Sequence, residues 1–385
     1  MTKVRQRIDL MREFSVPLVL GVAVALVWAN LSPENYSRFL YNHFFGRLSF
    51  HFVTNDIFMV FFFGIAAVEI TQSCLPGGDL NPPGKAVNPL LATLGGVLGP
   101  AVVYLVLNHF IGSDTLRRGW GIPTATDIAF AWLVAKAIFG ERHPAVSFLL
   151  LLAVADDGIG LAIIALFYPD PRVPPQSAWL LLTAAGVLMA LIMKRRKVLN
   201  YWPYVLIGGG LSWTGLFKSH LHPALALVFI IPFLPHASRE SKRFFEEDVA
   251  DRSALSRFEH EWKVIVDFGL FMFGLANSGV AFSSAGTATW LVFVSLLVGK
   301  IGGIFFLGTV ARKSGFPLPS GMKAKDLLLV SVIAGIGFTV ALFIAGEAFS
   351  DPVVQGAARM GAILSFSAAL IALALGRLLQ IRKIR

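Results

Sequence analysis

Long apolar stretches separated by short polar connections follow one another along nearly the whole chain. About 20 residues of helix cross the hydrocarbon core of a bilayer, and most of these stretches approach that length. Twelve can be placed, and the pattern predicts an all-α polytopic membrane protein with about twelve transmembrane helices. The predicted segments are residues 13–31, 52–71, 87–109, 119–139, 144–168, 177–193, 200–217, 221–236, 263–281, 287–311, 325–349 and 354–378.

The composition is that of a membrane protein rather than of a soluble domain. Of the 385 residues, 56% are hydrophobic and 15% are charged, whereas soluble domains carry about 25% charged residues. The net charge of +10 would suit nucleic acid, but the basic residues cluster between apolar segments, so we expect the bilayer and no nucleic acid as partner. The single cysteine, Cys74, allows no internal disulfide.

Lysine and arginine residues are distributed unevenly between the two sides of the predicted bundle. With both termini placed inside, the inner connections collect most of them, including the run 194–197, and the outer connections hold only a handful. Positive residues favour the cytoplasmic side of a membrane. We therefore expect both termini to be cytoplasmic and residues 237–262 to form a charged cytoplasmic loop.

Two of the predicted helices contain a break in mid-segment. In the fourth segment, Pro123 removes a backbone donor and disfavours helix at the preceding residue. In the eleventh, Gly335 and Gly337 each weaken the helix by roughly 1 kcal/mol relative to alanine. Non-helical backbone persists at membrane depth only where protein or a water-filled cavity surrounds it.

Each interrupted helix is the middle one of three, which predicts two repeats, residues 87–168 and 287–378, comprising helices 3–5 and 10–12. The spacing of seven segments inverts one repeat relative to the other, and we expect helices 4 and 11 to cross. Paired breaks in inverted repeats indicate the binding site of a transporter. Two independent glycine-rich packing helices are the alternative. The rest of this single transporter domain, 1–385, comprises the first helices, 12–31 and 52–71, and the middle helices, 177–281.

Charged residues at membrane depth accompany the breaks. Asp156 and Asp157 lie in the middle of the apolar run 147–167, where an ionised carboxylate is expensive and indicates an ion or proton site. Asp127 directly follows the first break, and Lys300 lies inside the tenth segment. If like helix ends face each other at the crossing, an acid near the N-terminal ends and a cation near the C-terminal ends stabilise them.

The aspartate pair suggests how transport is coupled. On a helix, neighbouring side chains point about 100° apart, so one carboxylate can face a cavity while the other faces a cation such as Lys300. Protons and a small cation would compete for the pair, which titrates as a coupled unit. If only a neutralised site changes access, cation–proton exchange follows. A structural buried ion pair is the alternative.

These residues resemble the NhaA family of bacterial sodium/proton antiporters over nearly the whole chain. The motifs that carry the resemblance are GIPTATDIAFA at 121–131, DD at 156–157 with IALFY at 164–168, ANSG at 276–279, GK at 299–300 and GIGFT at 335–339.

The resemblance implies an electrogenic exchanger of the bacterial inner membrane that expels Na⁺ or Li⁺ for protons, contributes to sodium and pH homeostasis, is not an enzyme and needs no cofactor. Asp157 matches the principal cation ligand and Asp156 its partner, which pairs with Lys300; Thr126 and Asp127 match the break beside the site. Pro123, Gly335, Gly337 and Thr339 match the interrupted helices. Glu69, His222, Glu259 and His260 match residues of the pH response.

The chain also departs from the family pattern. Ser73 stands where a second acid is expected, and Glu261-Trp262-Lys263 follows His260 where a further histidine is expected. Residues 31–52 are short for the outer hairpin through which the family forms homodimers. Asp267 has no counterpart in the pattern, and we expect it at the edge of a loop.

Other function classes remain open from the residues alone. A sodium-coupled symporter of organic anions shares this architecture but does not need the aspartate pair as a proton carrier. An intramembrane aspartyl protease needs acids on two spans, whereas Gly77-Gly78-Asp79 lies in a predicted loop. A sensor that has lost transport is the third alternative.

Overall fold

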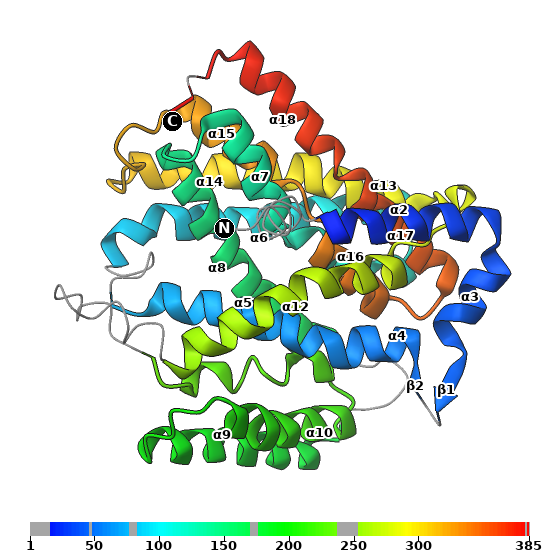
Figure 1. Ribbon diagram of the computed structural model, residues 1–385. Coiled ribbons are helices and arrows are strands. Elements are labelled where there is room, and N and C mark those ends of the chain that lie inside the picture. Colours follow the sequence, from blue (N-terminus) through cyan, green and yellow to red (C-terminus); the bar gives the residue numbers. More distant parts are fainter. Residues whose placement is uncertain are drawn as a thin grey trace, which may run out of the picture.

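The computed structural model describes residues 16–45, 48–76, 83–169, 176–236, 253–381 and 383–384, and these are mainly helical (Figure 1). Residues 12–15 of the first predicted helix, residues 237–252 of the predicted loop, and Asp79 lie outside the described residues.

Six helices in the described residues are long and apolar enough to cross a membrane, and two bent pairs raise that number to eight. Three of the six are single helices: Ala86–Ile111 within α6 (Pro83–Ile111), α8 (Pro144–Phe167) and Ser177–Arg195, which contains α9 (Leu180–Arg195). The other three join two helices each: Phe50–Cys74 joins α4 (Phe50–Phe52) and α5 (Met59–Cys74) through a π-helical turn, Thr287–Lys313 joins α13 (Thr287–Val294) and α14 (Ile301–Lys313) through another, and Pro352–Leu378 joins α17 (Pro352–Leu364) and α18 (Ser367–Leu378). The chain is thus a multi-pass membrane protein, although twelve spans are not established by this count.

The other predicted segments have different outcomes. The first contains α2 (Val16–Leu31), and the seventh contains a π-helical turn followed by α10 (Gly210–Lys218). The prediction of a helix over 221–236 is wrong, because this segment forms short 3-10 turns at Pro223–Leu225 and Ile231–Phe233. Its prolines, Pro223, Pro232 and Pro235, lack the amide hydrogens that a continuous helix requires.

The ninth predicted helix begins earlier than expected, as α12 (Ala254–Asn277), so residues 254–262 are not part of a loop. Ser253 starts the helix by accepting a hydrogen bond from the amide of Ser256. Buried Leu255 and Phe258 hold the first turns against the rest of the protein. The expected loop-edge position of Asp267 is wrong for the same reason, because Asp267 lies in the interior of α12.

The expected all-α fold includes one small exception. After α3 (Pro33–Tyr41), strand β1 (His43–Phe45) pairs antiparallel with β2 (Leu48–Ser49). This short hairpin lies beside α3 at the edge of the bundle (Figure 1).

Helix α6 approaches α14 (Ile301–Lys313) and the π-helical turn before it closely, because both spans carry glycine four residues apart, at Gly95 and Gly99 and at Gly299 and Gly303. A side chain on Gly95 or Gly99 would collide with the backbone of Gly303 or Gly299 on the other helix. Small residues at this spacing allow membrane helices to pack backbone to backbone. The close contact places Lys300, at the end of the π-helical turn before α14, directly against Gly96.

The outer surface of the bundle is apolar, as a lipid-facing surface must be. Along α6, Leu94, Leu98 and Val102 recur every four residues and are 44%, 57% and 57% exposed. Helices α9 and α10 form one edge of the molecule and α18 (Ser367–Leu378) the opposite edge (Figure 1). The bent pairs lie in the interior between these edges, among buried residues of the main core.

Candidate functional site

The two interrupted helices meet at their breaks. A 3-10 helix (Asp114–Thr124) and α7 (Ile128–Phe139) are bent by 50°, and α15 (Ala324–Ala334) and α16 (Thr339–Ala348) by 47°. The amide of Asp127 donates to the carbonyl of Ile336 at 2.7 Å, and Thr126 Oγ1 donates to the carbonyl of Ala334 at 3.0 Å. These bonds satisfy backbone groups that the breaks release.

Asp127 lies where the N-terminal ends of α7 and α16 come together. Its Oδ1 accepts from the amide of Phe130 at 3.1 Å, and its Oδ2 accepts from the amide of Thr339 at 3.2 Å. Both amides belong to first turns, where the helix dipole favours negative charge. One buried carboxylate therefore caps two half-helices at once, which is the arrangement predicted from the sequence for an acid at the crossing.

Lys300 lies on the opposite side of the crossing, near C-terminal helix ends. Its Nζ is 2.7 Å from Asp156 Oδ2 and donates to the carbonyl of Thr124, the last residue of the 3-10 helix, at 2.5 Å. The side chains of Lys300 and Asp156 are fully buried. The contact expected between Lys300 and Asp156 is present, and the ammonium also faces a helix end that carries partial negative charge.

Asp157 has different surroundings, because it lines a cavity of about 700 Å³. Its Oδ1 is shielded from solvent and has no hydrogen-bond donor among the residues that the structure describes. Thr126, Asp127 and Thr339 from the crossing line the same cavity. Buried polar atoms without partners are rare and indicate a functional role or an absent partner.

The three carboxylates at the crossing thus differ in what surrounds them. Asp127 accepts from two helix N-termini, Asp156 is paired with Lys300, and Asp157 faces the cavity. A carboxylate oxygen can be neutralised by a proton or can coordinate a small hard cation, for which oxygen ligands are preferred. Asp127 also lines the cavity, but both of its oxygens accept from helix amides, whereas Asp157 Oδ1 has no donor among the described residues.

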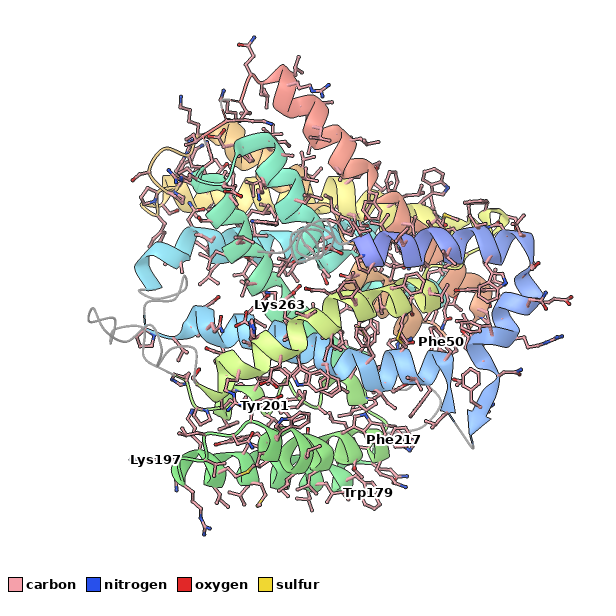
Figure 2. All side chains as sticks on the ribbon, viewed as in Figure 1. Phe50, Trp179, Lys197, Tyr201, Phe217 and Lys263 are labelled. Carbon is pink, nitrogen blue, oxygen red and sulfur yellow. The ribbon has the colours of Figure 1, made fainter. Side chains whose placement is uncertain are left out.

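A second charged group lies at the end of this cavity where α5 (Met59–Cys74) ends. Lys263 Nζ is 3.3 Å from Glu69 Oε1 and 3.8 Å from Glu259 Oε1, so it links α5 with α12. Gln72 Nε2 donates to Glu259 Oε2 at 2.6 Å. Figure 2 shows Lys263 between these two helices. The structure therefore brings together Glu69 and Glu259, two of the four residues predicted for the pH response.

The other two are elsewhere. His222 lines a different cavity, of about 810 Å³, together with Asp56 and Glu347, and His222 Nε2 is 3.3 Å from Glu347 Oε1. His260 is exposed on α12 and does not line either cavity.

Sequence reasoning missed Glu347. Glu347 is an acid inside the eleventh apolar segment, and that position was a signal of the same kind as Lys300. Arg359, a second charged residue inside a predicted apolar segment, is only 7% exposed within α17 (Pro352–Leu364). The partner of His222 lies 125 positions away, so no local pattern indicates it.

The family model and the similar proteins that match this chain are all Na⁺/H⁺ antiporters. The chain matches the family described as Na⁺/H⁺ antiporter 1 over residues 8–379. It is 67% identical over 378 residues to the Na⁺/H⁺ antiporter NhaA of Geotalea uraniireducens (strain Rf4), with 98% of each chain covered. It is 66% identical over 380 residues to the Na⁺/H⁺ antiporter NhaA of Geobacter sulfurreducens, covering 99% of this chain and 100% of the relative.

Among solved structures, the sodium proton antiporter MjNhaP1 from Methanocaldococcus jannaschii superposes with a TM-score of 0.49 at 15% identity, over 96% of this chain and 98% of that chain. The family assignment rests on the sequence matches, which span almost the full length at high identity. The chain belongs to the Na⁺/H⁺ antiporter 1 family.

Proposed function

We propose that the chain is a secondary active transporter that exchanges Na⁺ or Li⁺ for protons by alternating access. The observation that carries this proposal is Asp157, a carboxylate with an unpaired, shielded oxygen in a cavity that reaches the crossing of two interrupted helices. The names of the relatives, which are Na⁺/H⁺ antiporters, support the same activity.

In the proposed mechanism, the transported cation and the proton compete for Asp157, with Asp156 as its partner. The negative charge of Asp157 must be neutralised before the site can move through a low-dielectric interior, because an uncompensated charge there is expensive. Either a proton or a cation provides that neutralisation. Thr126 and Asp127 line the same cavity and are proposed to contact the cation. Lys300 compensates charge at Asp156 and at the helix end.

Exchange of more than one proton per cation would move net charge, and the Asp156–Lys300 pair is the proposed second proton carrier. The transporter is then electrogenic.

We propose a bacterial inner-membrane location with both termini cytoplasmic, twelve spans and two inverted repeats, 87–168 and 287–378, on the basis of the segment pattern and the distribution of basic residues. A homodimer and the absence of a cofactor are proposed on the family resemblance.

The proposed pH response involves groups on both sides of the protein. Glu69 and Glu259 share Lys263 at the end of the inner cavity, the one that contains Asp157. His222 contacts Glu347 in the other cavity, and His260 is exposed on the same helix as Glu259.

The experiment that tests the function uses everted membrane vesicles from a host without its own antiporters. A respiration-driven pH gradient is established, and Na⁺, Li⁺, K⁺ or an organic anion is then added. Exchange predicts that Na⁺ or Li⁺ dissipates the gradient and that the organic anion does not. Dissipation that requires the anion would favour the symporter, and no response to any ion from correctly inserted protein would contradict transport.

A further inference from the structure

The inner cavity contains a lysine that the proposed exchange does not use. Glu259, Lys263 and Asp267 follow one another at intervals of four residues on α12, so they share one helix face. Lys263 and Asp267 line the cavity that also contains Asp157. Glu69 faces them from α5.

Lys263 lies at the end of that cavity where α5 ends. Gln72 and Ser73 line the cavity in the last turn of α5, which ends at Cys74, whereas Asp157 lies in the middle of α8. A cation that enters from this end therefore passes the Lys263 ammonium before it reaches Asp157. Figure 2 shows Lys263 between α5 and α12.

The ammonium is held by contacts that are easily exchanged. The side chains of Lys263, Glu69 and Glu259 are 40%, 31% and 25% exposed, so water screens their attraction. Ion pairs with this exposure stabilise a protein little. Their carboxylate oxygens also suit Na⁺ and Li⁺, which are hard cations that prefer oxygen ligands.

We propose that Lys263 is a tethered competitor of the transported cation, and that its ammonium lowers the apparent Na⁺ affinity by occupying the carboxylates at this end of the inner cavity. This proposal rests on the proposed exchange function. An incoming cation must displace the ammonium from Glu69 and Glu259, and the positive charge also opposes its approach to Asp157. Lys263 thereby shifts the working range of the exchanger to higher Na⁺ concentrations.

The test measures KM and kcat for Na⁺-driven proton movement in everted vesicles at about pH 8.5, where protons compete least for carboxylates. Lys263→Gln and Lys263→Met remove the charge and differ in polarity, so failure of one variant to fold leaves the other. Lys263→Arg retains the charge. Lys313→Gln is the matched control, because Lys313 is an exposed lysine at the end of α14 that does not line the cavity.

Removal of the charge should lower KM for Na⁺ by about two- to five-fold, which corresponds to the coupling of a half-exposed ion pair, with kcat retained. Added choline chloride should reduce the difference, because salt screens exposed charges. Lys263→Arg and Lys313→Gln should keep the parental KM.

An unchanged or higher KM in folded Lys263→Gln and Lys263→Met protein would overturn the proposal. Loss of exchange in both variants at normal abundance would also overturn it, because Lys263 would then be required structurally. These results are separate from a failure of the proposed function, in which the parental protein itself gives no Na⁺-driven proton movement.

Discussion

Replacement of Lys300 by alanine tests the charge arrangement at the crossing most directly. The ammonium is 2.7 Å from Asp156 Oδ2, and both side chains are fully buried. Removing one partner of a buried pair costs about 3–5 kcal/mol, because the remaining charge is uncompensated. Lys300→Ala also removes the donor to the Thr124 carbonyl. We expect a clear fall in the unfolding temperature of the purified protein.

The loss of Lys300 should also change the pH dependence of Na⁺ binding, because the uncompensated charge of Asp156 favours protonation of that carboxylate. Asp156 can relieve its uncompensated charge by taking up a proton, and Na⁺ binding then requires a higher pH. About 1.4 kcal/mol corresponds to one pH unit, so we expect the midpoint of Na⁺ binding to move upward by about one to two units. Na⁺ affinity at about pH 7 should fall accordingly.

The measurement is a titration of Na⁺ binding against pH for the parental protein, Lys300→Ala and Lys300→Arg. Arginine keeps the charge and should retain more activity, although its planar fork fits the site less well than an ammonium. An unchanged midpoint in Lys300→Ala, or a midpoint at lower pH, would refute the inferred coupling between Lys300 and the aspartates.

Three further predictions follow from the site and its packing. Asp157→Asn should abolish Na⁺-driven proton movement while the protein still folds, and exchange at the parental rate in purified protein would show that Asp157 has no such role. Exchange should rise with pH from about pH 6 to about pH 9 as protons leave the carboxylates; a flat profile at both saturating and subsaturating Na⁺ would contradict competition. Gly303→Ala should separate α6 from α14 and lower the free energy of unfolding by about 1–3 kcal/mol, because an added Cβ collides with the Gly95 backbone. Gly302→Ala is the control and should be tolerated, because nothing lies within 4 Å of an added Cβ there. Equal unfolding temperatures for the two variants would contradict the close packing.

The parts of the site that depend on charged residues within apolar membrane segments could be predicted from the sequence. A lysine and several aspartates inside membrane segments require partners, and the helix breaks limited where those partners lie. This reasoning led to a contact of Lys300 with one aspartate of the pair and to Asp127 at the N-terminal helix ends, and the family resemblance identified that aspartate as Asp156; the structure contains both contacts.

Features that depend on the path of the backbone were not predictable in this way. Hydropathy marks residues 221–236 as a span, but it does not register that three prolines prevent a continuous helix. The mixed charges of residues 254–262 suggested a loop, whereas their buried apolar face against the bundle makes them helical. Contacts such as Lys263 with Glu69 join residues far apart in the sequence, so their distances come only from the fold.

The two cavities define what alternating access would require of this protein. Asp157 lines only the inner cavity, and the two cavities share no lining residue. Helix α16 nevertheless contributes to both, with Thr339 and Val340 at the inner cavity and Gly346 and Glu347 at the outer one, so roughly 9 Å of helix separates the nearest lining residues, Val340 and Gly346. Asp127 fixes the inner end of α16, and the contact of Glu347 with His222 fixes its outer end. In the proposed alternating-access mechanism, a change of access that repacks α16 would have to keep the carboxylate of Asp127 at the helix ends that it caps.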